Sequence, residues 1–148
     1  MAKSIVFLDT SIFITALLSD TGGSFYILNN CKDRVQFRTN EYVLSEIDEV
    51  LITKFPERKD MRTKLFLLLG ITEVEIIKNP SKNQSAKFQG YISDKDLPIL
   101  ASAAESSDYL LTLDNEFFNQ SVTASLKAPG LMILKPKMFI ELSRAGRI

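Results

Sequence analysis

The chain has 148 residues, of which 45% are hydrophobic and 24% charged, and its 18 Lys and Arg residues balance its 18 Asp and Glu residues. This length and composition predict one globular domain over residues 1–148, and the neutral net charge excludes a broad basic field for nucleic acid. The chain has no histidine, which excludes Ser–His and Cys–His triads, histidine-ligated zinc and histidine-based acid–base catalysis.

The lone cysteine, Cys31, cannot form an internal disulfide, and such cysteine usage favours a reducing compartment. No stretch is long and apolar enough to cross a bilayer, and the N-terminus runs into a strand-like segment without a signal-peptide cleavage region. We therefore expect a cytoplasmic protein with no membrane partner.

Short apolar runs alternate with helical periodicity along the whole chain. In the first half, the patterns predict a strand at 4–9, helices at 11–19 and 24–32, a strand at 35–39, and helices at 41–54 and 58–69, with Gly70 ending the second. A strand at 72–77 follows, and the polar and basic segment 78–90 is expected to be an exposed loop or a loosely packed connection. The remaining patterns predict a helix at 96–106, a strand at 109–113, a short helix near 115–119, a strand at 131–134 and a helix at 136–144. This alternation predicts an α/β fold with a mostly parallel sheet covered by helices on both faces.

Four acidic residues stand where this fold can bring their carboxylates together. Asp9 and Asp114 directly follow predicted strands, and the carboxyl ends of parallel strands meet at one edge of a sheet. Glu46 lies in the helix at 41–54, and Asp96 lies at the start of the helix at 96–106. Clustered carboxylates repel one another unless a hard cation such as Mg²⁺ or Mn²⁺ neutralises them, so the pattern indicates metal-assisted phosphodiester chemistry.

Each of these acids also has an ordinary structural explanation. Asp9 and Asp114 could cap the helices that follow them, and for Asp96 taken alone a cap is the better interpretation. Glu46 taken alone is uninformative. The combination of all four acids favours the functional interpretation.

Three further residues are candidates for supporting roles around the acids. Asp94 is two residues from Asp96, and in a helix the two would face different sides, so Asp94 is expected beside the ligands rather than among them. Ser11 and Thr112 flank the strand-end acids and could orient their carboxylates by hydrogen bonding. Ordinary turn or cap duty explains these two hydroxyls equally well.

Four short motifs resemble those of the PIN-domain family, and together they cover nearly the whole chain. They are Val6-Phe7-Leu8-Asp9-Thr10-Ser11-Ile12-Phe13, Tyr42-Val43-Leu44-Ser45-Glu46-Ile47, Asp94-Lys95-Asp96-Leu97-Pro98-Ile99-Leu100-Ala101-Ser102-Ala103 and Leu111-Thr112-Leu113-Asp114-Asn115-Glu116-Phe117-Phe118. The end, Ile133-Leu134-Lys135-Pro136-Lys137-Met138-Phe139, is similar to the closing strand and helix of bacterial and archaeal members.

The resemblance implies a three-layer α/β/α sandwich and a Mg²⁺- or Mn²⁺-dependent ribonuclease. Asp9, Glu46, Asp96 and Asp114 match the family's metal-binding and catalytic acids, and Glu116 falls where some members have a further acid. Bacterial and archaeal members are often toxins of toxin–antitoxin pairs, of the VapC type, and usually form dimers. An antitoxin protein and a second copy of the chain are therefore expected partners, beside an RNA substrate.

Other classes with an aspartate after the first strand fit less well. A haloacid-dehalogenase-type phosphatase needs a second aspartate where Ser11 stands, and a receiver domain needs an acidic pair where only Asp9 is present. A dinucleotide-binding fold needs a glycine-rich first turn, which this chain lacks. The alternative that stays open is a PIN-fold module that binds RNA or protein without catalysis.

Two surfaces are predicted from charge and hydrophobicity. Lys78, Lys82, Lys87 and Lys95 precede or adjoin the Asp96 motif and could form a basic rim that binds RNA, although a solvated loop explains them at least as well. The residues at 65–69 are consecutively apolar, so a helix there is buried on all sides or meets a partner. We expect the second, a homodimer, with Leu68 pointing outward.

Overall fold

The computed structural model describes residues 2–126 and 130–148, and its centre is a five-stranded parallel sheet. The strand order is β3-β2-β1-β4-β5, with Val6 of β1 paired both to Phe37 of β2 and to Tyr109 of β4. The strands are β1 (Ser4–Leu8), β2 (Val35–Asn40), β3 (Glu75–Ile77), β4 (Tyr109–Leu111) and β5 (Met132–Leu134). The expected α/β fold with a parallel sheet is therefore confirmed.

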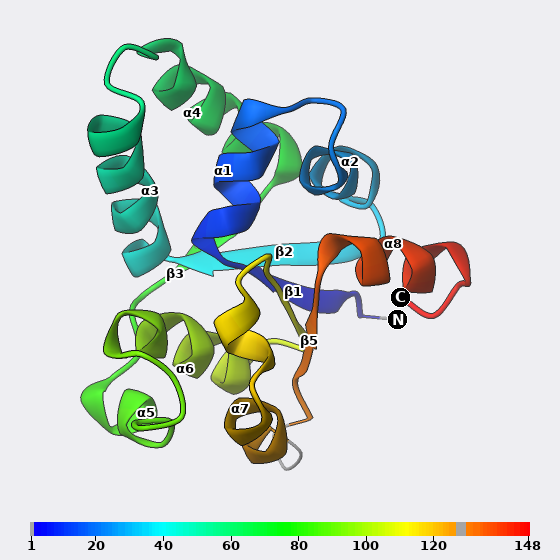
Figure 1. The fold of residues 1–148 in the computed structure, drawn as a ribbon. Helices are drawn as coiled ribbons and strands as arrows, with labels where there is room; N and C mark the ends of the chain where they lie inside the picture. Colours follow the sequence, from blue (N-terminus) through cyan, green and yellow to red (C-terminus); the bar gives the residue numbers. More distant parts are fainter. Residues whose placement is uncertain (1, 127–129) are drawn as a thin grey trace.

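Helices cover both faces of this sheet and give the molecule three layers (Figure 1). The layer above the sheet in Figure 1 holds α1, α2, α3, α4 and α8, and the layer below holds α5, α6 and α7. The helices are α1 (Thr10–Leu18), α2 (Gly23–Asn30), α3 (Glu41–Lys54), α4 (Asp60–Thr72), α5 (Lys82–Ala86), α6 (Leu97–Ser106), α7 (Gln120–Ser125) and α8 (Pro136–Arg144), with short 3₁₀ turns η1 (Asp94–Asp96) and η2 (Asn115–Phe118).

The chain reverses its direction of travel across the sheet between β1 and β4. It moves outward from β1 through β2 to β3, then returns to add β4 on the other side of β1 and β5 beyond it. Right-handed crossovers then place the connecting helices of the two halves on opposite faces. In open α/β sheets, ligands bind beyond the carboxyl ends of the strands at such a reversal. Here these are the carboxyl ends of β1 and β4, which Asp9 and Thr112 directly follow.

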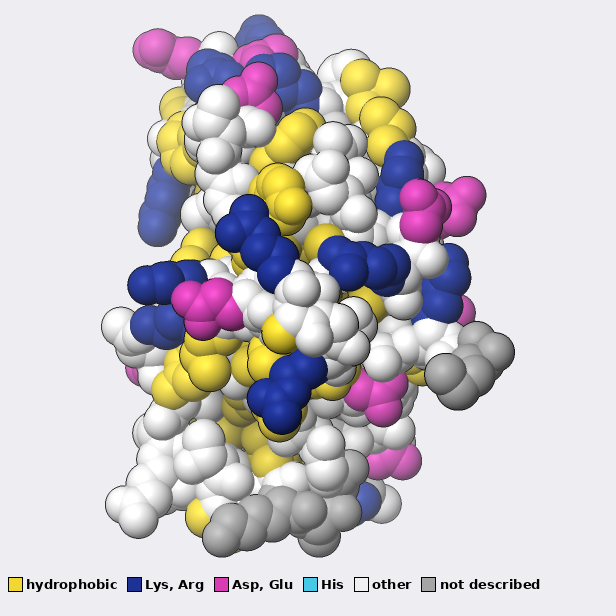
Figure 2. Space-filling model, turned by 90° about the vertical axis from the view of Figure 1, so that its right-hand side faces the viewer, with side chains coloured by type: hydrophobic (Ala, Val, Ile, Leu, Met, Phe, Trp, Pro, Cys, Tyr) yellow, Lys and Arg dark blue, Asp and Glu magenta, His cyan; other side chains and the backbone are white. Residues whose placement is uncertain are grey.

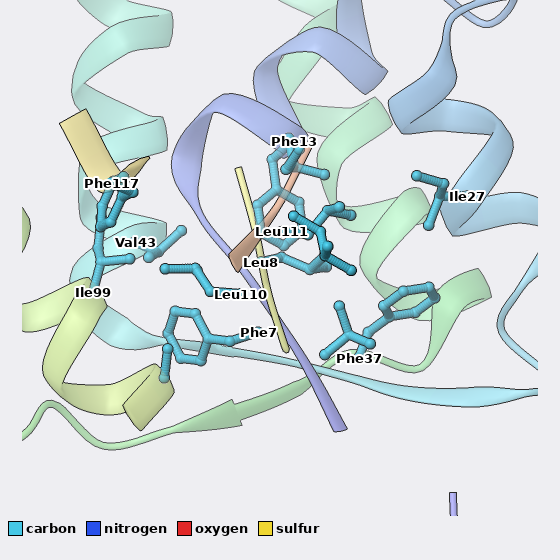
Figure 3. Packing of buried hydrophobic residues seen from close by; sticks show 14 of the residues in the cluster. Phe7, Leu8, Phe13, Ile27, Phe37, Val43, Ile99, Leu110, Leu111 and Phe117 are labelled. Carbon is cyan, nitrogen blue, oxygen red and sulfur yellow. The ribbon is translucent and has the colours of Figure 1, made fainter. Parts of the chain in front are cut away.

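The central strands are buried on both faces, which explains their uninterrupted apolar runs. Phe7 and Leu110 lie beside Ile99 of α6, whereas Leu8 and Leu111 lie toward Phe13 of α1 (Figure 3). The four strand side chains and Phe13 are fully buried. In the observed register, Phe7 pairs with Leu110 and Leu8 with Leu111, and this pairing brings the carboxyl ends of β1 and β4 side by side.

Two predicted boundaries around α4 are wrong. The helix continues through Gly70 to Thr72, and Glu73 ends it in a left-handed conformation, with a φ of 52°. Thr72 is buried and its hydroxyl donates to the carbonyl of Leu68, so tertiary packing outweighs the weak helix propensity of the glycine. The strand predicted to begin at residue 72 therefore begins only at Glu75.

The segment 78–90 is largely exposed, as its polar composition predicts, but part of it is helical. It contains α5, whose N-terminus is closed by a capping box in which Ser81 and Gln84 bond each other's backbone. Phe88 packs into the core with 6% of its surface exposed. Sequence analysis also missed α7, which Asn119 caps by accepting from the N–H of Val122.

Within the described ranges, no single helix has the length and hydropathy needed to cross a membrane. Helices α1 and α2 taken together reach that length and hydropathy, as a pair bent by 98°.

Candidate metal centre

Three carboxylates from two parts of the chain, η1 and the turn that follows β4, converge beyond the carboxyl ends of β1 and β4. Asp96, Asp114 and Glu116 each offer one oxygen, and these oxygens lie within 4.8 Å of one another. Asp96 is buried, Asp114 is half-buried and Glu116 is exposed, so the cluster has a closed side and an open side. Glu116, which the family resemblance gives only as a further acid beside the main four, thus lies inside the cluster.

Asp9 forms the buried floor beside this cluster, with 3% of its surface exposed. Leu8 pairs with Leu111, so the sheet register brings Asp9 next to Thr112. One oxygen of Asp9 accepts from the Ser11 hydroxyl at 2.5 Å and from the N–H of Ile12 at 3.3 Å, and the other accepts from the Thr112 hydroxyl. The carboxylate is therefore held in one orientation.

The hydroxyls of Ser11 and Thr112 were expected to orient the two strand-end acids, Asp9 and Asp114. Both hydroxyls donate to Asp9. Thr112 Oγ1 in turn accepts from the N–H of Asp114, and Ser11 Oγ accepts from the N–H of Leu113, each at 3.0 Å. These bonds join the end of β1 to the loop after β4. The positions of Asp9 and Asp114 are thus coupled through Thr112.

Glu46 reaches the same region from α3. It is half-buried, and one carboxylate oxygen accepts from the Thr10 hydroxyl at 2.8 Å. Asp114 and Lys95 are close enough to act on its charge with opposite sign. All four acids predicted from the sequence therefore lie in one neighbourhood, with Glu116 as a fifth.

The capping explanations hold for two acids and fail for the third. Asp9 accepts from the N–H of Ile12, and Asp114 accepts from the N–H of Glu116 at 3.0 Å, so both acids do cap the turn that follows them. Asp96 makes no capping bond to α6. It accepts instead from the Ser93 hydroxyl at 2.9 Å, and that hydroxyl lies 3.2 Å from a Glu116 oxygen.

The other predicted residues differ in where they lie relative to the cluster. Asp94 is exposed and lines a separate pocket with Lys82 and Gln89. Lys78 and Lys87 are exposed, and of the four lysines Lys95 is the one whose charge acts on both Asp96 and Glu46.

Sequence reasoning missed two hydroxyls at the site, Thr10 and Ser93. Thr10 lies next to Asp9, and Ser93 stands three residues before Asp96, a spacing at which a hydroxyl can reach a carboxylate. Thr10 bonds Glu46, and Ser93 bonds Asp96. Their closeness in sequence to Asp9 and Asp96 was the feature from which both could have been predicted as site residues.

Burial makes the charged forms of these acids costly. It raises the pKa of Asp9 to about 6, although the hydroxyls of Ser11 and Thr112 oppose the rise. Burial also raises the pKa of Asp96 to about 7, and the nearby Glu116 and Asp114 carboxyls add to the effect. The pKa of Glu46 is raised by burial and is partly restored by Thr10 and Lys95. A cation among these oxygens would relieve this cost.

These raised pKa values predict that the metal-free protein loses stability as pH rises. Asp9 and Asp96 bind protons more tightly when folded than when unfolded, so their contribution to stability is fully present below about pH 4. It is lost as pH rises through about 6 for Asp9 and about 7 for Asp96, and together the loss amounts to a few kcal/mol.

Urea unfolding at a series of pH values, with a chelator present, measures this loss. The Asp96→Asn variant is expected to show a shallower decline, because it lacks the later of the two titrations. Identical pH dependence in the two proteins would contradict the assignment of the raised pKa to Asp96.

No family profile and no curated protein sequence matches the chain significantly, but solved structures share its fold. One is a chain in the crystal structure of VapBC2 from Rickettsia felis bound to a DNA fragment from their promoter. It has a TM-score of 0.65 and 20% identity, over 88% of this chain and 98% of that one.

Another is PAE2754 from Pyrobaculum aerophilum, with a TM-score of 0.60 and 16% identity, over 97% of this chain and 90% of that one. At these identities the likeness establishes architecture. The chain has the fold of a PIN domain.

Proposed function

We propose that this protein is a metal-dependent endoribonuclease, a hydrolase of RNA phosphodiester bonds, acting through a single PIN-like domain over residues 1–148. The observation that carries the proposal is the convergence of the Asp96, Asp114 and Glu116 oxygens within 4.8 Å, beside the buried Asp9. The position of this cluster at the reversal of strand order, where α/β folds bind ligands, supports a site rather than a chance group of surface acids.

The donor set fits Mg²⁺ or Mn²⁺. Every candidate ligand is a carboxylate oxygen, and these hard cations prefer oxygen to nitrogen or sulfur. Asp96, Asp114 and Glu116 would hold the ion, and Asp9 and Glu46 would contribute directly or through water. The mixed burial of the cluster leaves its exposed side, at Glu116, open to a substrate.

When bound, the cation would supply a water of lowered pKa and would neutralise charge that develops on the phosphate. The protein's own groups have separate tasks. Glu46, half-buried and with a raised pKa, is suited to orient the attacking water and accept its proton. Asp9, fixed by three hydrogen bonds, keeps the floor of the site rigid, and Thr112 holds the backbone at Asp114.

The proposal is tested by incubating the protein with single-stranded RNA and Mn²⁺ and analysing the ends of the products. Water attack with loss of the O3′ oxygen leaves a 3′-hydroxyl and a 5′-phosphate. Cyclic phosphate ends would instead indicate attack by the ribose 2′-hydroxyl and would contradict metal-assisted hydrolysis. RNA binding without any cleavage would favour the non-catalytic module.

We further propose that the nuclease is the toxin of a toxin–antitoxin pair and acts in the cytoplasm, where RNA is available and thiols such as Cys31 stay reduced. The structural likeness to a chain of the VapBC2 complex, together with the motif resemblance, supports an antitoxin protein as partner. Co-expression with the product of a small neighbouring gene tests this, and relief of growth inhibition together with co-purification is the expected result.

A homodimer is proposed through α4, whose outward side is apolar. Phe66 and Leu67 are 64% and 60% exposed, and Ile71 is 54% exposed. Leu68, expected from the sequence to point outward, is instead buried with 8% exposure, because it packs against the core. The residues to test are therefore Phe66 and Leu67.

Replacing Phe66 with Glu is expected to convert the dimer into a soluble monomer, because a charge at that position would be desolvated at the interface. The matched control is Met138→Glu on α8, at an apolar position 47% exposed, which should leave the dimer intact. Light scattering at micromolar concentration measures the mass. A wild type that is monomeric would exclude this interface. Equal molecular masses in solution for the Phe66→Glu and Met138→Glu variants would exclude it too.

A further inference from the structure

A second feature of the same sheet edge is a basic pocket beside α8. It has a volume of 560 Å³, and its lining includes Leu113, Lys135, Lys137, Ile140, Glu141 and Arg144. We name it the α8 pocket. Three of these side chains are cationic and one is anionic, in a chain whose total charge is zero.

The α8 pocket adjoins the acidic cluster directly. Leu113 precedes Asp114 in the chain, and Lys135 Nζ donates to Asn115 Oδ1 at 2.5 Å, one residue beyond Asp114. Lys135 also follows the last residue of β5, so the pocket opens at the carboxyl ends of the strands, as the cluster does. A ligand that contacts both the α8 pocket and the acidic cluster would therefore lie along the carboxyl edge of the sheet.

The N-terminus of α8 adds to the positive character of the pocket. No side chain caps this nine-residue helix. Pro136 has no N–H and the N–H of Phe139 donates to the Lys135 carbonyl, so the N–H groups of Lys137 and Met138 are the ones available to an anion. Lys and Arg side chains run across the middle of the face on which α2 and α8 lie (Figure 2). Lys137 and Arg144 are exposed and can approach a phosphate.

We propose that the α8 pocket binds a backbone phosphate of the single-stranded RNA substrate, adjacent to the phosphodiester at the acidic cluster. This inference rests on the proposed ribonuclease function. The bound cation would offset the negative charge of the cluster at the reacting phosphodiester, and a neighbouring cationic pocket would hold the next phosphate and so position the strand. Leu113, 39% exposed, gives the ribose or base an apolar surface at the junction.

The proposal relocates RNA binding from the lysines predicted from the sequence. Lys82 lines a different pocket, together with Asp94. The α8 pocket instead joins residues distant in sequence, from the loop after β4 and from α8, which is why no local run of basic residues reveals it.

The test compares pairs of charge-neutralising substitutions in an Asp114→Asn parent, in which cleavage is expected to be about 1,000-fold slower than in the wild type. The main variant carries Lys137→Gln and Arg144→Gln; Lys135 is kept, because it bonds Asn115 and lies 5.4 Å from the Phe118 ring. A second carries Lys82→Gln and Lys87→Gln. The matched control carries Lys54→Gln and Lys59→Gln, two exposed lysines around the far end of α3.

Binding of a fluorescein-labelled single-stranded RNA oligonucleotide is followed by anisotropy across a salt series with Mg²⁺ present. The main variant is expected to bind about tenfold more weakly at low salt, and its plot of log affinity against log salt should flatten by about 0.7 for each phosphate that the protein no longer neutralises. The control should follow the parent. The proposal would be overturned if the plot flattened only in the variant with Lys82→Gln and Lys87→Gln. It would also be overturned if RNA binding by the parent did not depend on salt.

This readout separates the pocket from the proposed catalysis. If the wild type does not cleave RNA but the main variant still shows a flatter salt dependence of RNA binding than the parent, the proposed function is wrong and the pocket proposal is retained. If the wild type cleaves RNA but the main variant binds RNA with the affinity and the salt slope of the control, the pocket proposal is wrong and the proposed function is retained. Tighter binding of the duplex than of the single strand would contradict the assigned substrate form.

Discussion

Replacing Asp114 with Asn should lower the rate of RNA cleavage about 1,000-fold, equivalent to about 4 kcal/mol of transition-state stabilisation. Asp114 contributes to the three-carboxylate cluster, and its charge acts on Asp9, Glu46 and Asp96. Asparagine keeps the size of the side chain and the oxygen that accepts from the N–H of Glu116. The loss of rate would therefore report the missing charge rather than a distorted loop.

The chain offers a matched control in Asp94→Asn. Asp94 is an acid two residues from Asp96, but it is exposed and faces a different pocket. This variant should cleave at the wild-type rate, measured with the same RNA and the same Mn²⁺ concentration. Equal losses in the two variants would show that the cluster is not the reaction centre.

Mn²⁺ should raise the thermal stability of the wild type strongly. A cation that binds the folded state alone stabilises it by about 2.7 kcal/mol at 100 times its dissociation constant. For a chain near this length, that corresponds to a rise in Tm of roughly 5–10 °C. The physical source is the relief of repulsion among acids that the fold holds together and the unfolded chain separates.

The double variant with Asp96→Asn and Glu116→Gln should lose this response. Without Mn²⁺ it should also be more stable than the wild type above about pH 7, where burial and neighbouring carboxyls make the Asp96 charge costly. Differential scanning fluorimetry with and without Mn²⁺, at matched ionic strength in NaCl, measures both effects. A rise in Tm of equal size in the variant would place cation binding elsewhere.

Most of the fold could be predicted from local sequence patterns. Strand β1 and helix α3 are readable because apolar runs and helical periodicity are short-range signals, and α3 spans the predicted 41–54. Parallel topology then follows from the alternation of elements, and it places Asp9 and Asp114 at one edge. Where tertiary packing decides, as at Gly70 inside α4, the local signal pointed the wrong way.

The site was predictable in outline but not in its contacts. Position at strand ends identified Asp9 and Asp114, whereas the inclusion of Glu116 depends on how η2 turns after Asp114. The shared use of Ser11 and Thr112 by Asp9 depends on the pairing of Leu8 with Leu111, which no periodicity specifies. Likewise, the direction of Leu68 depends on the rotation of α4 against the core, and the sequence leaves that rotation undetermined.

The central claim is that RNA cleavage by this protein requires a divalent cation, and withdrawal and return of the cation test it most directly. Cleavage of single-stranded RNA by the wild type should disappear in excess EDTA and return when Mg²⁺ or Mn²⁺ is added beyond the chelator. Because the chain has no histidine, it has no histidine-based, metal-free route to the same products. Cleavage that continues undiminished in excess EDTA would contradict the account.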